Sequence, residues 1–317
     1  MKKGQQIKFF NFPFDFDPDA NFFLDLIQDV LSSRSYPFPI HFYGCYPKMS
    51  TSKKAISYFY SRFSDAGMTR WLKLQQGEVT PYDSSAFNIW CTFENRRPPV
   101  EGFDLTFSFD VDSYSGTNCY LPLIYLYVNH NNNDRGIIHS KHSLSICETT
   151  QKRELEDDFF EAKSGFLSAF VNNPHPMRLR AIKDLSEVGE IDLFGRSVRN
   201  YIEDKIGTAG KYWFNLCFEN DLYPGYVTEK ILEAWISKSV PLYWGSDKAG
   251  ILNPDAYVNL KDFDCLGDFV EYVSALYADK DRMKAMIKQP LFKKEFDYAS
   301  IFHFLIKGLD LRVAESR

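Results

Sequence analysis

The chain has 317 residues, of which 44% are hydrophobic and 25% charged, enough apolar material for two domains of about 150 residues. This composition excludes disordered and collagen-like chains. The 37 Lys and Arg residues are outnumbered by 42 Asp and Glu, and the net charge is -5. A basic surface that follows a phosphate backbone is therefore not expected, and nucleic acid is excluded as the default partner.

The start of the chain has neither an uninterrupted hydrophobic segment nor a small-residue cleavage site, so we expect no signal peptide. The longest apolar run, residues 120–128, is about half of the ~20 residues that a membrane-spanning helix needs. A soluble, cytoplasmic protein is expected, with peripheral association at the inner face of a membrane kept open. The cysteines are scattered without a C-x-x-C pair, which favours free thiols in a reducing compartment over disulfides.

In chain order, the first half alternates short apolar strands with helical patterns. Strands are predicted at residues 7–12, 39–46, 87–94, 105–110 and 121–128, and helices at residues 21–31 and 53–63. Pro98 and Pro99 stop the third strand because proline has no N–H to give to a sheet. The polar residues 129–134 and the charged residues 148–163 then predict a boundary between residues 130 and 165.

The second half begins a new series of strands and helices. Strands are predicted at residues 166–171, 190–194, 212–218, 240–244 and 257–260, and helices at residues 177–186, 228–238 and 266–288. This alternation is typical of βαβ units with an open, mostly parallel sheet. We therefore predict two α/β domains, residues 1–150 and 151–317.

The tripeptide Phe-Glu-Asn occurs twice at the end of an apolar strand, at residues 93–95 and 218–220. Ligands of open α/β sheets bind beyond the carboxyl ends of the strands. Two such strand ends that faced one another would line a cleft between two domains.

The segment from Phe214 to Gly245 carries the strongest chemical pattern. A strand and a Pro-Gly loop lead to Thr228, which is placed to cap a helix with apolar residues at helical spacing. The free N–H groups of that helix start suit a diphosphate. Lys230 opposes the helix dipole there unless an anionic ligand lies beside it, and Glu229 can accept hydrogen bonds from sugar hydroxyls. An ordinary helix start with both side chains in solvent is the alternative.

The motif FEN-x(5)-YVTEKI followed by VP-x-YWG is similar to the signature of the α-1,3/4-fucosyltransferases, glycosyltransferase family 10. The segments 172–178 and 191–196 resemble the helix start and the D-x-(F/Y)-G loop of that family. Residues 93–98 and Phe109-Asp110 resemble its glutamate-containing stretch and the step that follows. The resemblance covers roughly residues 85–265.

The resemblance implies a GT-B fold, an α/β class in which two Rossmann-like domains face one another across a cleft. The domain of residues 1–150 would bind an N-acetyllactosamine-type glycan acceptor, and the domain of residues 151–317 would bind GDP-fucose. The implied reaction is an inverting transfer of fucose to the 3-hydroxyl of N-acetylglucosamine, which gives a Lewis-type product. No metal or further cofactor is implied.

The resemblance also implies the residues that bind the donor. Arg178 and Lys230 would neutralise the diphosphate, since displacement of a diphosphate needs charge stabilisation on the leaving group. Glu229 would hold the ribose, and Tyr226 and Asn220 would lie against the nucleotide sugar. A solvated arginine at a helix start is the alternative for Arg178.

Glu94 would be the general base that takes the proton from the acceptor hydroxyl. Its alternative is a strand-end glutamate paired with Arg96 or Arg97. Two other functions stay open: a metal-dependent transferase that uses Asp110 and Asp112, a D-x-D string, and a catalytically silent carbohydrate-binding protein.

Overall fold

The computed structural model describes residues 6–12, 22–44, 55–62, 69–76, 83–93, 95–98, 102–129 and 144–316. The chain divides into two compact units, residues 1–143 with 296–317, and residues 144–295. The first change of unit therefore falls after residue 143, within the predicted boundary region but before the expected residue 150. The carboxyl-terminal residues depart further from expectation, because they return to the first unit.

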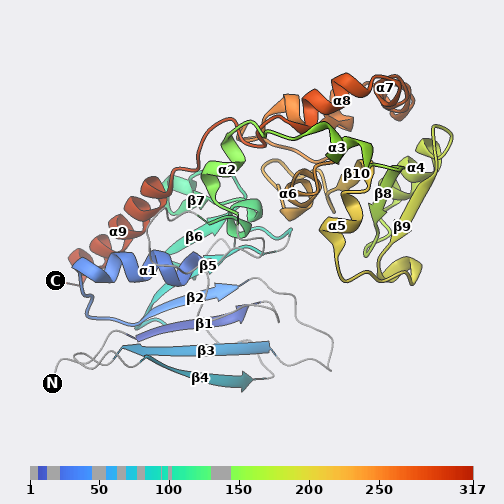
Figure 1. Cartoon of the computed structure of the whole chain (residues 1–317). Helices are drawn as coiled ribbons and strands as arrows, with labels where there is room; N and C mark the ends of the chain where they lie inside the picture. The colour runs from blue at the N-terminus through green and yellow to red at the C-terminus, as the bar shows by residue number, and fades with distance from the viewer. Residues whose placement is uncertain are drawn as a thin grey trace. The chain divides into compact units, whose positions relative to one another are not determined.

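The first unit is built on a sheet with the order β4-β3-β1-β2-β5-β6-β7 (Figure 1). Its strands are β1 (Gln6–Phe12), β2 (Ile40–Gly44), β3 (Ala55–Arg62), β4 (Thr69–Gln76), β5 (Phe87–Cys91), β6 (Leu105–Ser108) and β7 (Asn118–Tyr120). Neighbours in the series β1, β2, β5, β6 and β7 pair in parallel, whereas β3 pairs antiparallel with both β1 and β4.

Two predicted elements of this unit are wrong. Residues 53–63 were expected to be helical but contain strand β3, because aromatic residues such as Tyr58 and Tyr60 favour strands and β1 offers a free edge for pairing. Residues 121–128 were expected to be a strand but form the 3-10 helix η2 (Leu123–Tyr127). Pro122 immediately precedes η2 and has no N–H for a ladder, so β7 ends at Tyr120.

Two helices, α1 (Phe22–Ser33) and α9 (Tyr298–Glu315), belong to the first unit and lie side by side in Figure 1. Phe304 of α9 meets Phe107 of β6 with ring centroids 5.6 Å apart. Gly308 lies so close to the sheet that an added Cβ would be 2.5 Å from Leu105 Cδ1. This packing is the physical reason that residues 296–317 belong with the first unit and not with the second.

The second unit has a wholly parallel sheet with the order β12-β11-β10-β8-β9. The strands are β8 (Gly165–Phe170), β9 (Ile191–Phe194), β10 (Tyr212–Phe218), β11 (Val240–Trp244) and β12 (Val258–Asn259). The helices are α2 (Ile146–Thr150), α3 (Asp157–Glu161), α4 (Pro176–Leu185), α5 (Lys205–Ala209), α6 (Glu229–Ile236), α7 (Leu266–Ala278) and α8 (Lys280–Ile287). All five predicted strands are present, and the core is formed around Phe214, Leu216 and Leu242.

The helix predicted at residues 266–288 is interrupted at Asp279. This residue leaves the helical conformation (φ -105°, ψ 83°), and its carboxylate accepts a hydrogen bond of 3.0 Å from the N–H of Arg282. Asp279 therefore ends α7 and caps α8, a role that competes with continuing the helix.

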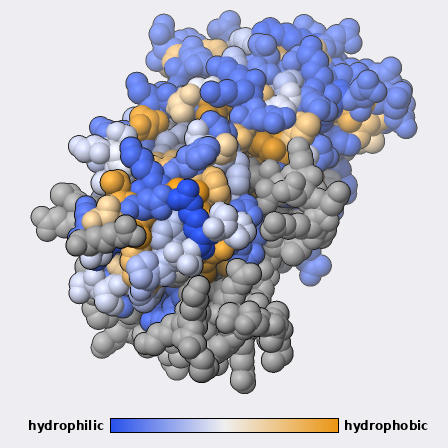
Figure 2. Space-filling view, turned by 90° about the vertical axis from the view of Figure 1, so that its left-hand side faces the viewer, coloured by the Kyte–Doolittle hydropathy of each residue, from blue (hydrophilic) through white to orange (hydrophobic). Residues whose placement is uncertain are grey.

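Polar residues cover much of the surface drawn in Figure 2, and apolar residues appear there in small groups. Among the described cysteines, Cys91 and Cys217 are buried free thiols. Across the part of the chain that the structure describes, none of the helices has both the length and the apolar character needed to cross a membrane.

Candidate functional site

The strand order of the second unit reverses between β8 and β10. The chain runs from β8 to β9 in one direction and then continues through β10, β11 and β12 in the other. In doubly wound sheets, ligands bind outside the carboxyl ends of the strands at this switch point. The segments that follow β8 and β10 are therefore the candidate site.

Arg178 connects these two strand ends. It lies in the first turn of α4, and its guanidinium donates to the carbonyl of Asn173 after β8 and to the carbonyl of Phe218 at 2.6 Å. A longer contact of 3.4 Å reaches Oδ1 of Asn220. Only 4% of Arg178 is exposed, so the alternative of a solvated helix-start residue is wrong. Burial lowers the pKa of Arg178 from the ordinary arginine value.

Helix α6 begins at the end of the loop that follows β10. Thr228 caps it as predicted, because its hydroxyl oxygen accepts a 3.5 Å hydrogen bond from the N–H of Lys230. The same hydroxyl donates its proton to Oε2 of Glu219 at 2.8 Å. The N–H of Thr228 donates to Oε1 of Glu219, also at 2.8 Å.

The anion beside Lys230 is a carboxylate of the protein itself. The Lys230 ammonium donates to Glu219 Oε2 at 3.1 Å and to Thr228 Oγ1 at 2.9 Å. The Glu219 side chain is 0% exposed, whereas 22% of the Lys230 side chain reaches solvent. An anionic ligand is the compensation that the sequence predicts for the cation at this helix start, and Glu219 already supplies one negative charge there.

Electrostatics keep the ammonium protonated. Burial alone would lower the pKa of Lys230, but the carboxylates of Glu219 and Glu229 outweigh it and hold that pKa above the ordinary lysine value. Glu229 Oε1 lies 3.6 Å from the ammonium. Its side chain is partly exposed, so Glu229 is not confined to the interior.

The predicted donor residues thus lie near the carboxyl end of β10, and their side chains differ in how far they are exposed to solvent. Asn220 and Arg178 are in contact, and Lys230 and Glu229 form an ion pair. Tyr226 is only 2% exposed and lies in the same loop, so it offers a ligand no open ring face.

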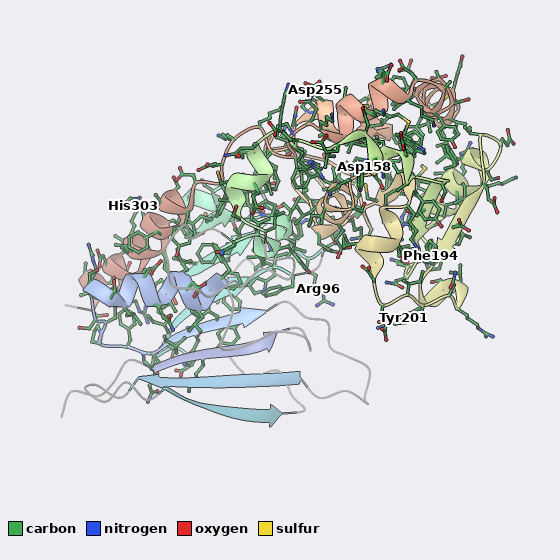
Figure 3. The ribbon with its side chains drawn as sticks, viewed as in Figure 1. Arg96, Asp158, Phe194, Tyr201, Asp255 and His303 are labelled. Atoms are coloured by element: carbon green, nitrogen blue, oxygen red, sulfur yellow. The ribbon has the colours of Figure 1, made fainter. Side chains whose placement is uncertain are left out.

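Glu94, the predicted general base, lies outside the described residues. It follows β5 in the first unit, which ends at Cys91. Of the two arginines that could pair with it, Arg96 is exposed and points away from the sheet (Figure 3). Arg97 donates to Oδ1 of Asn95 at 3.1 Å, and its guanidinium carbon lies 5.1 Å from the ring centroid of Phe109.

The D-x-D string forms a turn held by Tyr114. The hydroxyl of Tyr114 donates to the buried carboxylate of Asp110, and its N–H donates to Asp112 Oδ1 at 2.8 Å. Asn118 also donates to the carbonyls of both aspartates, at 3.0 Å and 2.6 Å. This arrangement favours a structural role for the pair. In the residues that the structure describes, no three His, Cys, Asp or Glu side chains gather as a metal-binding group.

Glu219 is the site residue that the sequence reasoning left without a role. Its position at the end of an apolar strand was visible in the Phe-Glu-Asn repeat. A carboxylate is almost never fully buried unless it is paired, so its burial depends on donors that only the folded loop brings near.

The second unit is similar in sequence to proteins of a known family. Residues 160–288 match the family "Glycosyltransferase family 10 (fucosyltransferase) C-term". The alpha-(1,3)-fucosyltransferase FucT of Helicobacter pylori is 30% identical over 234 residues, which are 64% of this chain and 47% of that protein. Human 4-galactosyl-N-acetylglucosaminide 3-alpha-L-fucosyltransferase FUT6 is 31% identical over 153 residues, 44% of this chain and 42% of that protein. The chain therefore spans under half the length of these two relatives.

Solved structures show the same likeness. An α1,3-fucosyltransferase crystallised with GDP has a TM-score of 0.57 and 26% identity, over 71% of this chain and 75% of that one. The structure with GDP-fucose has a TM-score of 0.58 and the same identity and coverage. The α/β fold class expected from the sequence, GT-B, is confirmed, while the cleft between the units stays a prediction. The second unit of this chain thus contains a region, residues 160–288, that matches the carboxyl-terminal domain of glycosyltransferase family 10.

Proposed function

We propose that this protein transfers L-fucose from GDP-β-L-fucose to the 3-hydroxyl of N-acetylglucosamine in a lactosamine-type glycan. One observation carries the proposal: two cations, Arg178 and Lys230, are anchored at the same strand end, beside the start of α6. Solved relatives of this fold were crystallised with GDP and with GDP-fucose. The switch point of the second sheet is therefore our proposed donor site.

In the proposed reaction, the acceptor oxygen attacks the anomeric carbon of fucose from the face opposite GDP. The bond between that carbon and the phosphate oxygen breaks, and GDP leaves with the electron pair. Glu94 takes the proton of the acceptor hydroxyl, and the β-linked donor becomes an α-fucoside. Negative charge grows on the diphosphate, where a fixed ammonium and the N–H groups of α6 stabilise it.

The geometry suggests how the donor residues share this work. Two hydrogen bonds occupy two of the three ammonium protons of Lys230, and its exposed part can direct the third to a phosphate oxygen. Arg178 already donates to backbone carbonyls, so we assign it the alignment of the two strand ends and a positive charge behind the diphosphate. Glu229 and Asn220 remain proposed contacts of the ribose and the nucleotide sugar, and buried Tyr226 supports the loop between them.

Calorimetric titration with GDP tests the donor site. Lys230→Ala should weaken GDP binding by roughly 1.5–3 kcal/mol, the range for hydrogen bonds to charged groups. Lys183→Ala is the matched control, since it removes one positive charge from an exposed position on α4. Equal losses in both variants, or none in Lys230→Ala, would remove Lys230 from the site.

A panel of GDP-sugars and lactosamine acceptors, with the product linkage determined by NMR, tests the reaction itself. An α-fucoside on the 3-hydroxyl supports the proposal. Tight GDP binding without any turnover would instead favour the catalytically silent carbohydrate-binding protein.

A further inference from the structure

We propose that Glu219 is the positioning residue of the donor site, holding the Lys230 ammonium and the Thr228 cap where the diphosphate binds. This inference rests on the proposed function in one respect, which is that the ligand is a diphosphate. Its geometric basis does not depend on that function, because every contact lies within the second unit of the free protein.

Glu219 collects donors from two separate segments, the start of α6 and strand β11. The backbone N–H and hydroxyl of Thr228 reach it from the start of α6, and the ammonium of Lys230 follows from the first turn. The hydroxyl of Tyr243 approaches Oε1 from β11 at 3.5 Å. The N–H of Glu219 itself donates to the carbonyl of Trp244 at 2.9 Å. One carboxylate therefore joins the ends of β10 and β11 to the helix that follows.

Full burial makes this carboxylate different from a surface ion pair. An unpaired buried carboxylate is strongly unfavourable, so Glu219 and its donors must keep their arrangement together. The ammonium is restrained by the carboxylate of Glu219 and the hydroxyl of Thr228, and 22% of the Lys230 side chain is exposed to solvent. A ligand then meets a cation whose side-chain freedom is already reduced, which lowers the entropy cost of binding.

The charges that face Lys230 define the expected effect of a change. Glu219 and Glu229 raise the pKa of Lys230, nearby Tyr226 acts in the same direction, and burial opposes all three. In Glu219→Gln the amide keeps the volume but not the negative charge. Lys230 should consequently lose its proton at lower pH than in the unsubstituted protein.

The experiment combines two measurements on the full chain. Lysine side-chain NMR, with Lys230 assigned by its absence from Lys230→Ala, follows the ammonium without ligand. Calorimetry gives the dissociation constant of GDP from pH 7.5 to 9.5. We expect Glu219→Gln to bind GDP about threefold more weakly at pH 7.5 and about tenfold more weakly at pH 9.5, as the ammonium becomes neutral. GDP itself also titrates in this range, and that effect cancels when the dissociation constant of the variant is divided by that of the unsubstituted protein at each pH.

Glu233→Gln is the matched control. Glu233 is also a buried glutamate of α6, but its carboxylate pairs with Lys205. The ratio of its GDP dissociation constant to that of the unsubstituted protein should stay constant from pH 7.5 to 9.5. A constant ratio in Glu219→Gln as well, with the Lys230 signal unmoved, would overturn the proposal and leave Glu219 a merely structural residue.

Two further results distinguish a failure of the proposed role of Glu219 from a failure of the proposed donor function. If Glu219→Gln does not fold, NMR of the unsubstituted protein decides, because an ammonium that titrates at or below the ordinary lysine value of about 10.4 contradicts the proposed restraint. If the unsubstituted protein does not bind GDP, the proposed function fails, and the ligand-free titration of Lys230 still tests the role of Glu219.

Discussion

Gly308 in the middle of α9 offers a sharp test of the packing in the first unit. In Gly308→Ala, the new Cβ would lie 2.5 Å from Cδ1 and 2.9 Å from Cγ of Leu105. Leu105 belongs to β6 and is only 4% exposed, so its side chain would have to shift within the buried interior. The substitution therefore has two opposing effects: alanine favours the helix more than glycine does, but its Cβ clashes with Leu105.

The two effects have opposite signs and different sizes. Replacing a helical glycine with alanine stabilises an unobstructed helix by about 0.8–1 kcal/mol. Inserting a methyl group into a packed core costs about 1–3 kcal/mol. Because both close contacts are with a buried leucine, we expect the steric cost to exceed the helical gain, with a net loss of about 1 kcal/mol.

Urea unfolding together with hydrogen–deuterium exchange would measure this loss. Exchange should accelerate in peptides from α9 and β6 of Gly308→Ala. Lys307→Ala, an exposed change at the preceding residue of the same helix, should leave both unchanged within about 0.5 kcal/mol. A Gly308→Ala protein that is more stable than the original would refute the close packing of α9 on β6.

Three further predictions concern the base, a buried histidine and the D-x-D string. Glu94→Gln should lower turnover by about 10²–10⁴ while GDP affinity stays within about threefold, and near-normal turnover would place the base elsewhere. Burial lowers the pKa of His41 to about 4, so stability should fall as the pH drops below the unfolded value of about 6.5. That loss is about 2 kcal/mol between pH 7 and 5 and should be absent in His41→Gln. Asp112→Asn should be mild and turnover should persist in excess EDTA, whereas abolition by chelator and rescue by manganese would favour a metal-dependent transferase.

Local patterns were sufficient for much of the second unit. Strand β10 has the predicted bounds, 212–218, because a run of apolar and aromatic residues is buried on both faces of a parallel sheet. Thr228 is a cap for a reason visible in the sequence, since a hydroxyl residue precedes an apolar helical pattern. The family signature in the same segment directed attention to the strand end at which Arg178, Glu219 and Lys230 lie.

Contacts between distant parts of the chain decided the rest. Strand β3 forms where a helix was predicted, because its partner β1 is more than forty residues away in the chain and pairing overrides a short ambiguous pattern. The same holds for α9, which joins the first unit through Phe107 and Leu105. Sequence spacing alone does not reveal which sheet a terminal helix covers.

In the candidate site, too, some features follow from the sequence and others only from the tertiary structure. Residue type and order placed Lys230 at a helix start, and the expected need for a compensating anion followed from the helix dipole. Only the tertiary structure supplies that anion, because the loop after β10 folds so that the start of α6 lies against the end of β10 and Glu219 is enclosed. Burial, and with it the strength of the pairing, is a property of the assembled sheet and loops, whereas the chemical groups themselves are determined by the sequence.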